Sequence, residues 1–316
     1  MNRIFGGRKI WFWRIAIIVL TLFILMRIYF RATDDFRLTN IKYEMPYHKE
    51  WEIAPLDQSE NARLNAILDQ KFHYIGKGAQ SYVFGSDDGK YVIKFFKFKH
   101  LRPSWFIDAL PDISPLKEYK ENIAKRKARK LYGVFNGYKL AYDSDKENSG
   151  LIFIQLNPSN VHRDITLKDK LGFSRTVDLG DVVYVVQEKG VTLRNVLSQL
   201  LKEGDVATAK LRIGQIFNMY LSEYRKGILD HDHGVMQNAG FIGDRPIHLD
   251  IGKIHYDENI SQPENYQKDL LKLAYKMQFW IKNNFPQYYE PLVNDIEQKL
   301  SNIFGYEVKI PLEKKE

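Results

Sequence analysis

The sequence predicts an α+β fold, with a small antiparallel sheet in its first half, mostly helices in its second half, and one membrane-spanning helix in front. Three observations carry this prediction. Residues 10–30 are almost wholly apolar. Short runs of β-forming residues cluster between residues 72 and 187, and amphipathic helical patterns dominate from residue 191 onward.

Composition limits the classes of protein that fit. The chain has 316 residues, of which 44% are hydrophobic and 27% charged, so it has ample material for a core. A net charge of +8 fits an anionic membrane, nucleic acid, phosphorylated ligands or simply a solvated basic surface. No motif points specifically to nucleic acid. The chain has no cysteine, which excludes disulfides and cysteine metal sites.

The apolar run 10–30 has about the length needed to cross a bilayer, behind a basic tail at residues 1–9. Arg14 and Arg27 would extend toward the headgroups. No small-residue cleavage site follows the run, which favours a single uncleaved anchor over a signal peptide. The alternative is a buried helix of a soluble protein. Aromatic residues suited to the two interfaces flank the run, namely Trp11, Trp13 and Tyr29.

The positive-inside rule does not set the orientation of this span, because lysine and arginine are about equally frequent on both sides of it.

Residues 31–70 are predicted to form a linker followed by a helix over 60–70, which Ser59 is expected to cap. This helix is predicted to pack on the domain that follows. Two later apolar runs, 151–156 and 182–187, are predicted to be the fourth and fifth strands of the sheet.

The stretch 227–253 organises the rest of the chain. Asp232, Asn238 and Asp250 stand where short predicted strands give way to loops, so two carboxylates and a carboxamide are expected to converge. Such a set of oxygens suits Mg²⁺, which proteins usually bind together with substrate phosphates.

A Gly-x-Gly turn lies between two predicted strands at Gly76 and Gly78, with Ser81 and Val83 after it. Glycines let backbone N–H groups approach phosphate oxygens, although the same turn occurs in ordinary hairpins. Lys94 lies inside the next apolar strand, where a lysine either faces solvent at an edge or serves a partner. Together these features favour a nucleotide site.

These motifs resemble those of the protein-kinase-like superfamily. Gly76–Val83 is similar to its glycine-rich loop, and Lys94 to the lysine of V-A-I-K. Residues 227–232 lie over the family's Gly-Ile-Val-His-Arg-Asp, and residues 250–252 over its D-F-G. Two departures are visible. Asp230 stands where the family has His, and five residues instead of four separate Asp232 from Asn238. A four-residue spacing would put His233 in the catalytic position and indicate a pseudokinase.

The resemblance implies two lobes, over residues 71–189 and 190–316, with the small second lobe of lipopolysaccharide sugar kinases, aminoglycoside phosphotransferases and RIO-type kinases. It also implies a hinge near Glu188. The string His162-Arg163-Asp164 is not expected to be the catalytic loop, because it precedes that hinge. Roles follow residue by residue: Gly76, Gly78, Ser81, Val83, Lys94 and Glu188 for ATP, Glu118 (or Glu121) as the partner of Lys94, Asp232 as catalytic base, and Asn238 and Asp250 for Mg²⁺.

The implied function is that of a membrane-anchored phosphotransferase, which moves the γ-phosphate of ATP to a hydroxyl of a protein, lipid-linked sugar or small molecule. Use of ATP implies a cytoplasmic domain. One alternative is an inactive, nucleotide-binding pseudokinase at the membrane. A second is a metal-dependent hydrolase, built from the acidic and imidazole side chains of Asp230, His231, Asp232, His233, His248, Asp250 and His255.

Overall fold

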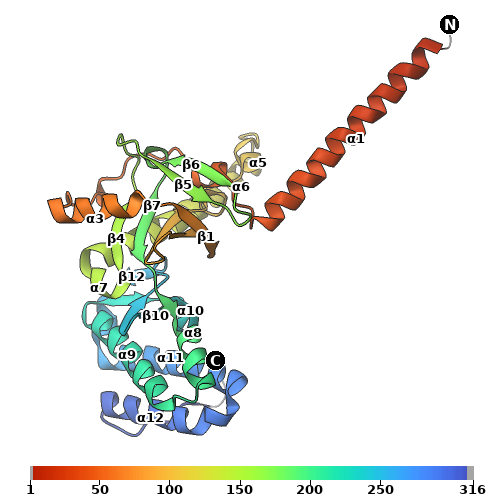
Figure 1. Ribbon diagram of the computed structural model, residues 1–316. Helices are drawn as coiled ribbons and strands as arrows, with labels where there is room; N and C mark the ends of the chain where they lie inside the picture. The colour runs from red at the N-terminus through yellow and green to blue at the C-terminus, as the bar shows by residue number, and fades with distance from the viewer. Residues whose placement is uncertain (1–2, 312–316) are drawn as a thin grey trace.

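The computed structural model describes residues 3–311, which form two lobes with one long helix, α1 (Arg3–Ala32), projecting from the first (Figure 1). The first lobe is built on a seven-stranded sheet in the order β4-β7-β3-β2-β1-β5-β6. The predicted α+β architecture is confirmed. The strands are β1 (Phe72–Lys77), β2 (Ser81–Ser86), β3 (Tyr91–Phe96), β4 (Leu151–Gln155), β5 (Asp164–Lys168), β6 (Ser174–Asp178) and β7 (Tyr184–Glu188).

The insert between β4 and β7 enlarges this sheet. Its hairpin, β5–β6, pairs with β1 through a parallel contact of β5, whereas the other neighbours in the sheet are antiparallel. The string His162-Arg163-Asp164 therefore leads into β5, the strand next to the β6 edge of the sheet. There Arg163 contacts Asp69, with a nitrogen–oxygen distance of 2.6 Å, and takes no part in the cleft described below.

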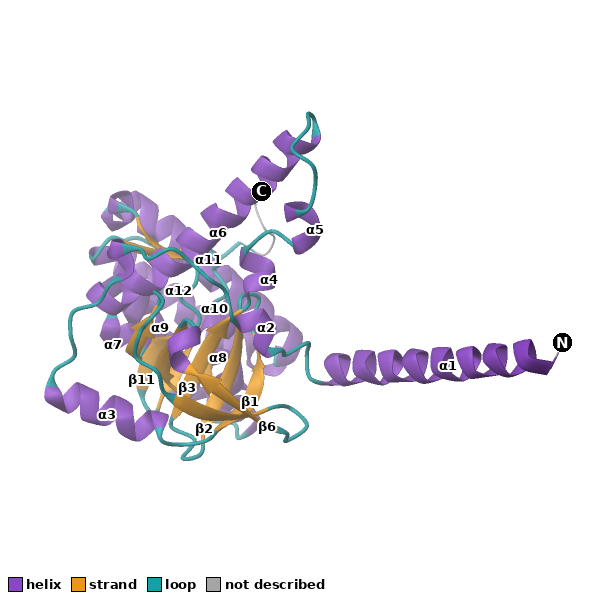
Figure 2. Ribbon diagram, turned by 90° about the horizontal axis from the view of Figure 1, so that it is seen from above, coloured by secondary structure: helices purple, strands orange, loops and turns teal. Residues whose placement is uncertain are grey.

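Helices cover both faces of the sheet (Figure 2). Apolar side chains of α3 pack on one face with those of β1, β2 and β3, as predicted for this segment. Side chains from the second half of α6 pack on the other face with β4 and β7. The helices of this lobe are α2 (Leu38–Ile41), α3 (Gln58–Leu68), α4 (Phe98–Leu101), α5 (Trp105–Asp108), α6 (Leu116–Ser144) and α7 (Lys146–Ser149).

The cap of α3 differs from the prediction. The helix begins at Gln58, and Asp57 caps it by accepting the backbone N–H of Glu60 at 2.8 Å, while the Glu60 side chain returns to the Asp57 N–H. Ser59 lies inside the first turn and donates to Asp57. Asp–x–x–Glu is a capping box as good as the Ser-based start that was expected, so the predicted cap was wrong by two residues.

The second lobe is mainly helical, with a separate core formed by its four long helices. These are α8 (Leu193–Lys202), α9 (Val206–Arg225), α11 (Pro263–Asn284) and α12 (Tyr289–Phe304). Short strands and one turn of helix carry the organising stretch between α9 and α11, namely β9 (Ile228–Asp230), α10 (Val235–Asn238), β10 (Ala239–Ile242), β11 (Arg245–His248) and β12 (Ile254–Tyr256). β8 (Val191–Thr192) joins the lobes and pairs with β10.

Helix α1 leaves the first lobe as an exposed rod (Figures 1 and 2). Among the described residues, Trp11–Ala32 is the one helical segment long and apolar enough to cross a membrane. Its last turn is attached to the sheet, because Tyr29 donates a hydrogen bond to Asp169 in the β5–β6 turn. Directly after the helix, Asp34 and Asp35 both adopt left-handed conformations, with φ of 56° and 63°.

Candidate active site

A cavity of about 610 Å³ lies between the two lobes. Its walls come from the β1–β2 turn, β3, the hinge after β7, the loop after β9 and the end of β11. Every predicted site residue except Glu118 lines it: Gly76, Gly78, Ser81, Val83, Lys94, Glu188, Asp232, Asn238 and Asp250. A hollow of about 730 Å³ near Lys42 and Asp181 is larger, but no predicted site residue lines it.

The glycine-rich turn is open toward this cavity. A side chain at Gly76 would meet no atom within 4 Å, and one at Gly78 would meet only the Ser81 hydroxyl at 3.7 Å. Packing therefore does not require glycine here, whereas close approach of a ligand to the backbone would. Neighbouring cations hold the turn from outside: Lys97 donates to the Gly78 carbonyl at 2.6 Å, and Lys77 pairs with Asp34 at 3.1 Å.

Lys94 projects from the central strand β3 into the cavity and is buried. Its ammonium group donates to the carbonyl of Leu249, at 2.5 Å, directly before Asp250. Burial lowers the pKa of Lys94, and the nearby charge of Asp250 acts in the opposite direction. A buried cation with a single hydrogen bond to a neutral carbonyl is suited to receive an anionic ligand.

The structure does not form the expected pair between Lys94 and Glu118. Glu118 is exposed in the first turn of α6, whereas the buried residues of this helix begin at Val134. No residue of α6, which the structure describes in full, lines the cavity; the helix packs closely on the segment after Asp250, where a side chain at Gly137 would lie 2.7 Å from the Ile254 carbonyl. Glu121 is exposed as well, so neither candidate glutamate reaches Lys94. Because α6 has 29 residues, both glutamates in its first two turns lie far from the half of the helix that packs on the sheet.

The loop after β9 places Asp232, and not His233, on the cavity wall. Lys253 pairs with one carboxylate oxygen of Asp232, Oδ2, at 3.0 Å. His233 turns away from the cleft and contacts Asp269 of α11. This loop has one residue more between Asp232 and Asn238 than the family that the chain resembles. The backbone accommodates it at His233, whose φ of 48° is left-handed. Hydrogen bonds at both of its ring nitrogens, to Asp269 and to the His231 carbonyl, offset the cost of that conformation.

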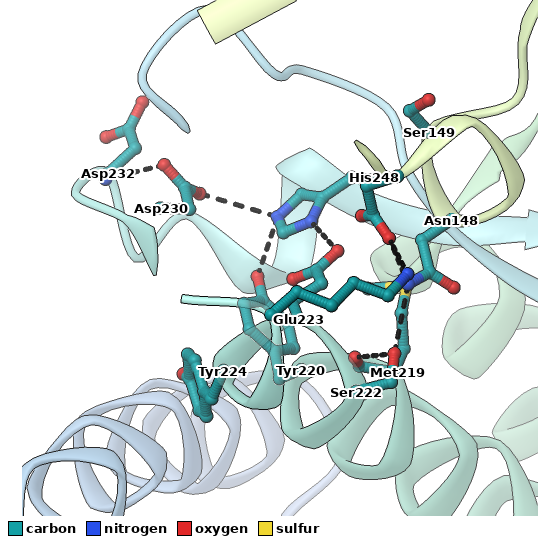
Figure 3. Close-up of polar contacts among 12 residues, drawn as sticks. Asn148, Ser149, Met219, Tyr220, Ser222, Glu223, Tyr224, Asp230, Asp232 and His248 are labelled. Atoms are coloured by element: carbon teal, nitrogen blue, oxygen red, sulfur yellow. Dashed lines mark hydrogen bonds and ion pairs between the residues drawn. The ribbon is translucent and has the colours of Figure 1, made fainter. Parts of the chain in front are cut away.

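A buried polar network supports this loop from below (Figure 3). Asp230 accepts the backbone N–H of Asp232 at 2.8 Å. His248, at the end of β11, lies between Asp230 and Glu223 of α9, with nitrogen–oxygen distances of 3.5 and 2.8 Å. Tyr220 also contacts His248, at 3.1 Å. The network thus connects α9 and β11 to Asp230, the residue at the position where the family that this chain resembles has a histidine.

Burial and neighbouring charges together shift the pKa values of the three ionisable side chains in this network. Burial alone would lower the pKa of His248, but the charges of Glu223 and Asp230 outweigh it and raise the pKa well above its usual range. Burial raises the pKa of Glu223 to about 7, an effect that His248 opposes. Burial would also raise the pKa of Asp230, but its contact with His248 lowers it. These directions favour an imidazolium beside an ionised Asp230, while Glu223 can gain or lose its proton near neutral pH.

Two side chains on the cavity wall fit a divalent cation. Asp250 uses its Oδ1 to accept the Gly252 N–H at 3.2 Å, and within residues 3–311 its second oxygen has no hydrogen-bond partner. The carboxamide of Asn238 is likewise free of hydrogen bonds to described residues and packs against Gly234, where a side chain would approach it to 2.7 Å. Carboxylate and carboxamide oxygens are hard ligands of the kind that Mg²⁺ prefers.

The hinge presents backbone groups rather than a side chain. The Glu188 carboxylate points into ion pairs with Arg245 and, at 3.0 Å, with Arg63. Its N–H donates to the Gly150 carbonyl at 2.9 Å, and the Lys189 N–H donates to Lys90 at 2.8 Å. Gly190 follows on the cavity wall, so its amide is the next donor that a ligand can reach.

The side chains required for a metal-dependent hydrolase do not converge. His231 stacks on His255, His233 contacts Asp269, and His248 is enclosed in its own network. In the described part of the chain, the one group of three or more potential ligands is His162, Asp178 and Asp181, at the far edge of the sheet. The hydrolase interpretation therefore has no geometric basis.

Comparison with known proteins gives matches in structure only. No protein-family model and no curated protein sequence matches the chain. A crystal structure of WbdD, a bifunctional kinase-methyltransferase, matches 72% of this chain with 15% identity and a TM-score of 0.36. This chain spans only 45% of WbdD.

Two further structures match. One is Rv3197 of Mycobacterium tuberculosis bound to erythromycin, with 13% identity, a TM-score of 0.34, and coverage of 75% of this chain and 59% of that chain. The other is the ternary complex of APH(2'')-IIa with streptomycin and ATP, with 13% identity, a TM-score of 0.24, and coverage of 80% and 95%. All these TM-scores lie below 0.5, so none of the likenesses carries an argument about function. The order of the elements and the residues around the cleft make the fold protein-kinase-like, a sheet-based lobe over a helical one behind an N-terminal apolar helix.

Proposed function

We propose that this protein is a membrane-anchored phosphotransferase that moves the γ-phosphate of ATP to a hydroxyl group of its acceptor. The observation that carries the proposal is the set of residues lining the cavity between the lobes. Four sequence-distant segments bring to it an open glycine-rich turn, a buried lysine, a loop carboxylate and a carboxylate–carboxamide pair. Phosphoryl transfer needs little beyond positioning and charge stabilisation, which these groups can supply.

The roles follow from where each group lies. Backbone N–H groups of the turn at Gly76–Ser81 would bind the phosphates, and Lys94 would bind the α- and β-phosphates with its ammonium group. The adenine would meet the hinge at Glu188 and Gly190. Asn238 and Asp250 would hold Mg²⁺, which when bound supplies positive charge beside the transferred group.

Asp232 would act as the general base. Lys253 occupies its Oδ2, and Oδ1 has no hydrogen-bond partner among the described residues. Oδ1 can therefore accept the proton of the acceptor hydroxyl as that oxygen bonds to the γ-phosphorus. The bond from this phosphorus to the bridging oxygen of ADP breaks, and its electron pair leaves with ADP. Asp230 and His248 would position the loop without touching the substrate.

The anchor would be α1, with the two lobes on the cytoplasmic side, where ATP is available. Tyr29 ties the end of this helix to the β5–β6 turn, and Asp34 ties the following turn to Lys77 of the glycine-rich turn. The cleft would therefore be held in a defined relation to the bilayer rather than on a loose tether.

One observation favours a second candidate function. In active kinases of the family that this chain resembles, the strand lysine forms an ion pair with a glutamate of a helix. Here no carboxylate of α6 reaches Lys94. A pseudokinase that binds Mg·ATP at the membrane without transfer would share every other feature of the cavity. The acceptor experiment separates the two candidates. The full chain in lipid nanodiscs, given γ-labelled ATP and a membrane extract, should label a component of that extract, whereas ATP binding without label transfer or hydrolysis supports the pseudokinase.

The lysine and the glutamate are expected to behave differently on substitution. Lys94→Ala should weaken Mg·ATP binding by about 10-fold or more, because a hydrogen bond to a charged group contributes about 1.5–3 kcal/mol. Glu118→Ala should leave the affinity unchanged, since Glu118 is exposed and lies many turns of α6 from the cavity. Isothermal titration calorimetry of both variants checks this. Equal losses in the two variants would mean that α6 moves Glu118 to Lys94 when nucleotide binds.

A further inference from the structure

The first half of α6 contributes no fully buried side chain to the core of the first lobe. Within residues 116–130, all of which the structure describes, no side chain is buried, whereas buried residues begin at Val134. This half nevertheless continues as a regular helix away from the lobe, and α5 lies beside its outer end (Figure 2). A helix that contributes nothing to a core is stabilised only by local pairs or by an external partner.

Residues 116–130 carry far more positive than negative charge. Basic residues far outnumber acidic ones, and only Lys120 and Lys127 make contacts, with Asp112 and with the His100 carbonyl. Partial burial and the neighbouring charges of Lys130 and Arg126 lower the pKa of Lys127, as expected where cations are crowded. The basic residues of 105–130 are Lys117, Lys120, Lys125, Arg126, Lys127, Arg129 and Lys130, and the acidic ones are Asp108, Asp112, Glu118 and Glu121.

Large apolar side chains lie exposed at the same end. Ile113, in the loop before α6, is 61% exposed, and Tyr119 in its first turn is 54% exposed. Phe106 of α5 is 60% exposed. Exposed apolar residues next to a cluster of cations are the composition of a surface that enters the interface of a bilayer, where anionic headgroups attract the cations and the apolar groups insert between lipids.

The position of this segment matches that of the anchor. In both views, α5 and the first half of α6 lie on the side of the first lobe from which α1 departs (Figures 1 and 2). Tyr29, Asp34 and Asp35 attach the end of α1 to that lobe, so the direction of α1 relative to α6 is set by contacts within the lobe. A membrane crossed by α1 would face the α5–α6 end.

We propose that residues 105–130, the α5–α6 projection, form a second membrane contact that docks on the anionic lipids of the leaflet next to the first lobe. This inference rests on the membrane anchoring proposed above and is independent of phosphoryl transfer. The occupant is an anionic lipid surface rather than a nucleic acid, because the projection pairs its cations with exposed apolar groups and lies beside the end of the transmembrane helix.

The chain offers a clean probe for this contact, because it contains no cysteine. An environment-sensitive fluorophore is attached at Ile113→Cys in the full chain, which is then incorporated into nanodiscs of phosphatidylcholine alone or of phosphatidylcholine with phosphatidylglycerol. A label at Phe279→Cys on α11, where Phe279 is 60% exposed, is the matched site in the other lobe. Quenching by aqueous iodide measures how far each label is protected.

Phosphatidylglycerol should lower the quenching constant at position 113 several-fold and leave that at position 279 unchanged. The protection should disappear in about 1 M salt, where the screening length is about 3 Å. It should also disappear when four exposed cations of α6 that make no contact with described residues, Lys125, Arg126, Arg129 and Lys130, are replaced by Glu. The same replacement of four exposed cations of the second lobe, Arg194, Lys202, Lys268 and Lys282, should not remove it.

Each other outcome contradicts the proposal. Equal quenching at position 113 in both kinds of nanodisc would show that no docking occurs. Equal loss of protection in both charge-reversal variants would reduce the effect to net charge. Protection produced by added RNA in phosphatidylcholine nanodiscs would assign the projection to nucleic acid. If the chain failed to enter phosphatidylcholine nanodiscs at all, the anchor itself would be wrong, and the docking surface with it.

Discussion

Asp232→Asn is expected to lower the rate of phosphoryl transfer by about 10²- to 10⁴-fold, the contribution typical of a positioned general base. The carboxamide has nearly the shape of the carboxylate but takes up no proton. Its backbone N–H still reaches Asp230, so the loop should keep its conformation. The affinity for Mg·ATP should therefore change little. Single-turnover rates with γ-labelled ATP, measured together with calorimetric affinities, separate the two effects.

His233→Asn is the matched control for this loop. Asparagine tolerates the left-handed backbone conformation better than most residues, so the loop should retain its path at φ of 48°. Because His233 faces Asp269 and not the cavity, transfer should continue at close to the wild-type rate. The opposite pattern, with transfer lost in His233→Asn and kept in Asp232→Asn, would shift the catalytic position by one residue along the chain.

His248→Ala is expected to cause the largest loss of stability, about 3–5 kcal/mol, because it breaks a buried ionic network by removing its central member. Asp230, which is buried, would lose its charged partner, and the buried Glu223 would lose its contact with the imidazole. Urea unfolding of the full chain in detergent micelles, followed by tryptophan fluorescence, measures the loss.

An exposed histidine–carboxylate pair provides the comparison. His73 contacts Asp87 at 2.5 Å on the surface of the first lobe, with nearly half of each side chain accessible. Exposed pairs contribute little, because water screens the charges and side-chain entropy opposes the contact. His73→Ala should therefore leave the unfolding transition almost unchanged. A similar loss in both variants would mean that the burial of His248 does not determine its contribution.

Local spacing explains what could be predicted from the sequence. The Gly-x-Gly turn, Lys94 and Asp250 each lie at the end of, or inside, an element whose period is readable over a few residues. Once strand and turn are recognised, the side of the sheet on which Lys94 projects follows from alternation. The structure accordingly brings these side chains to one cavity.

Long-range geometry explains what could not be predicted. The resemblance implied Glu118 as the partner of Lys94, but the first half of α6 projects from the lobe, and the helix packs on the segment after Asp250 only near Gly137. Glu223 and Tyr220 carry no local signal, since a polar residue on a long helix is usually solvated. His248, flanked by Ile247 and Leu249, was the one visible indication, because a histidine in a buried strand needs partners.

The loop around Asp232 lies between these two cases. Its apolar lead-in, Ile228 and Leu229, was readable and sets the register. The extra residue before Asn238 was visible too, but its consequence was not. Only the contacts of His233 with α11 show that this residue turns outward and leaves Asp232 facing the cavity. The spacing of a motif gives only the number of residues between two positions. It does not show that one of them is left-handed, which changes the direction of the side chains that follow.

The most direct test of the account is the binding of ATP to the full chain with and without Mg²⁺, measured by isothermal titration calorimetry in nanodiscs. The account predicts binding that is weakened by removal of Mg²⁺, by Lys94→Ala and by Asp250→Asn, since a neutral amide is a poorer ligand for a hard cation. Binding should persist in Asp232→Asn and Glu118→Ala. Failure of ATP to bind, or binding that is indifferent to Mg²⁺, Lys94 and Asp250, would contradict the assignment of the cleft as a nucleotide site.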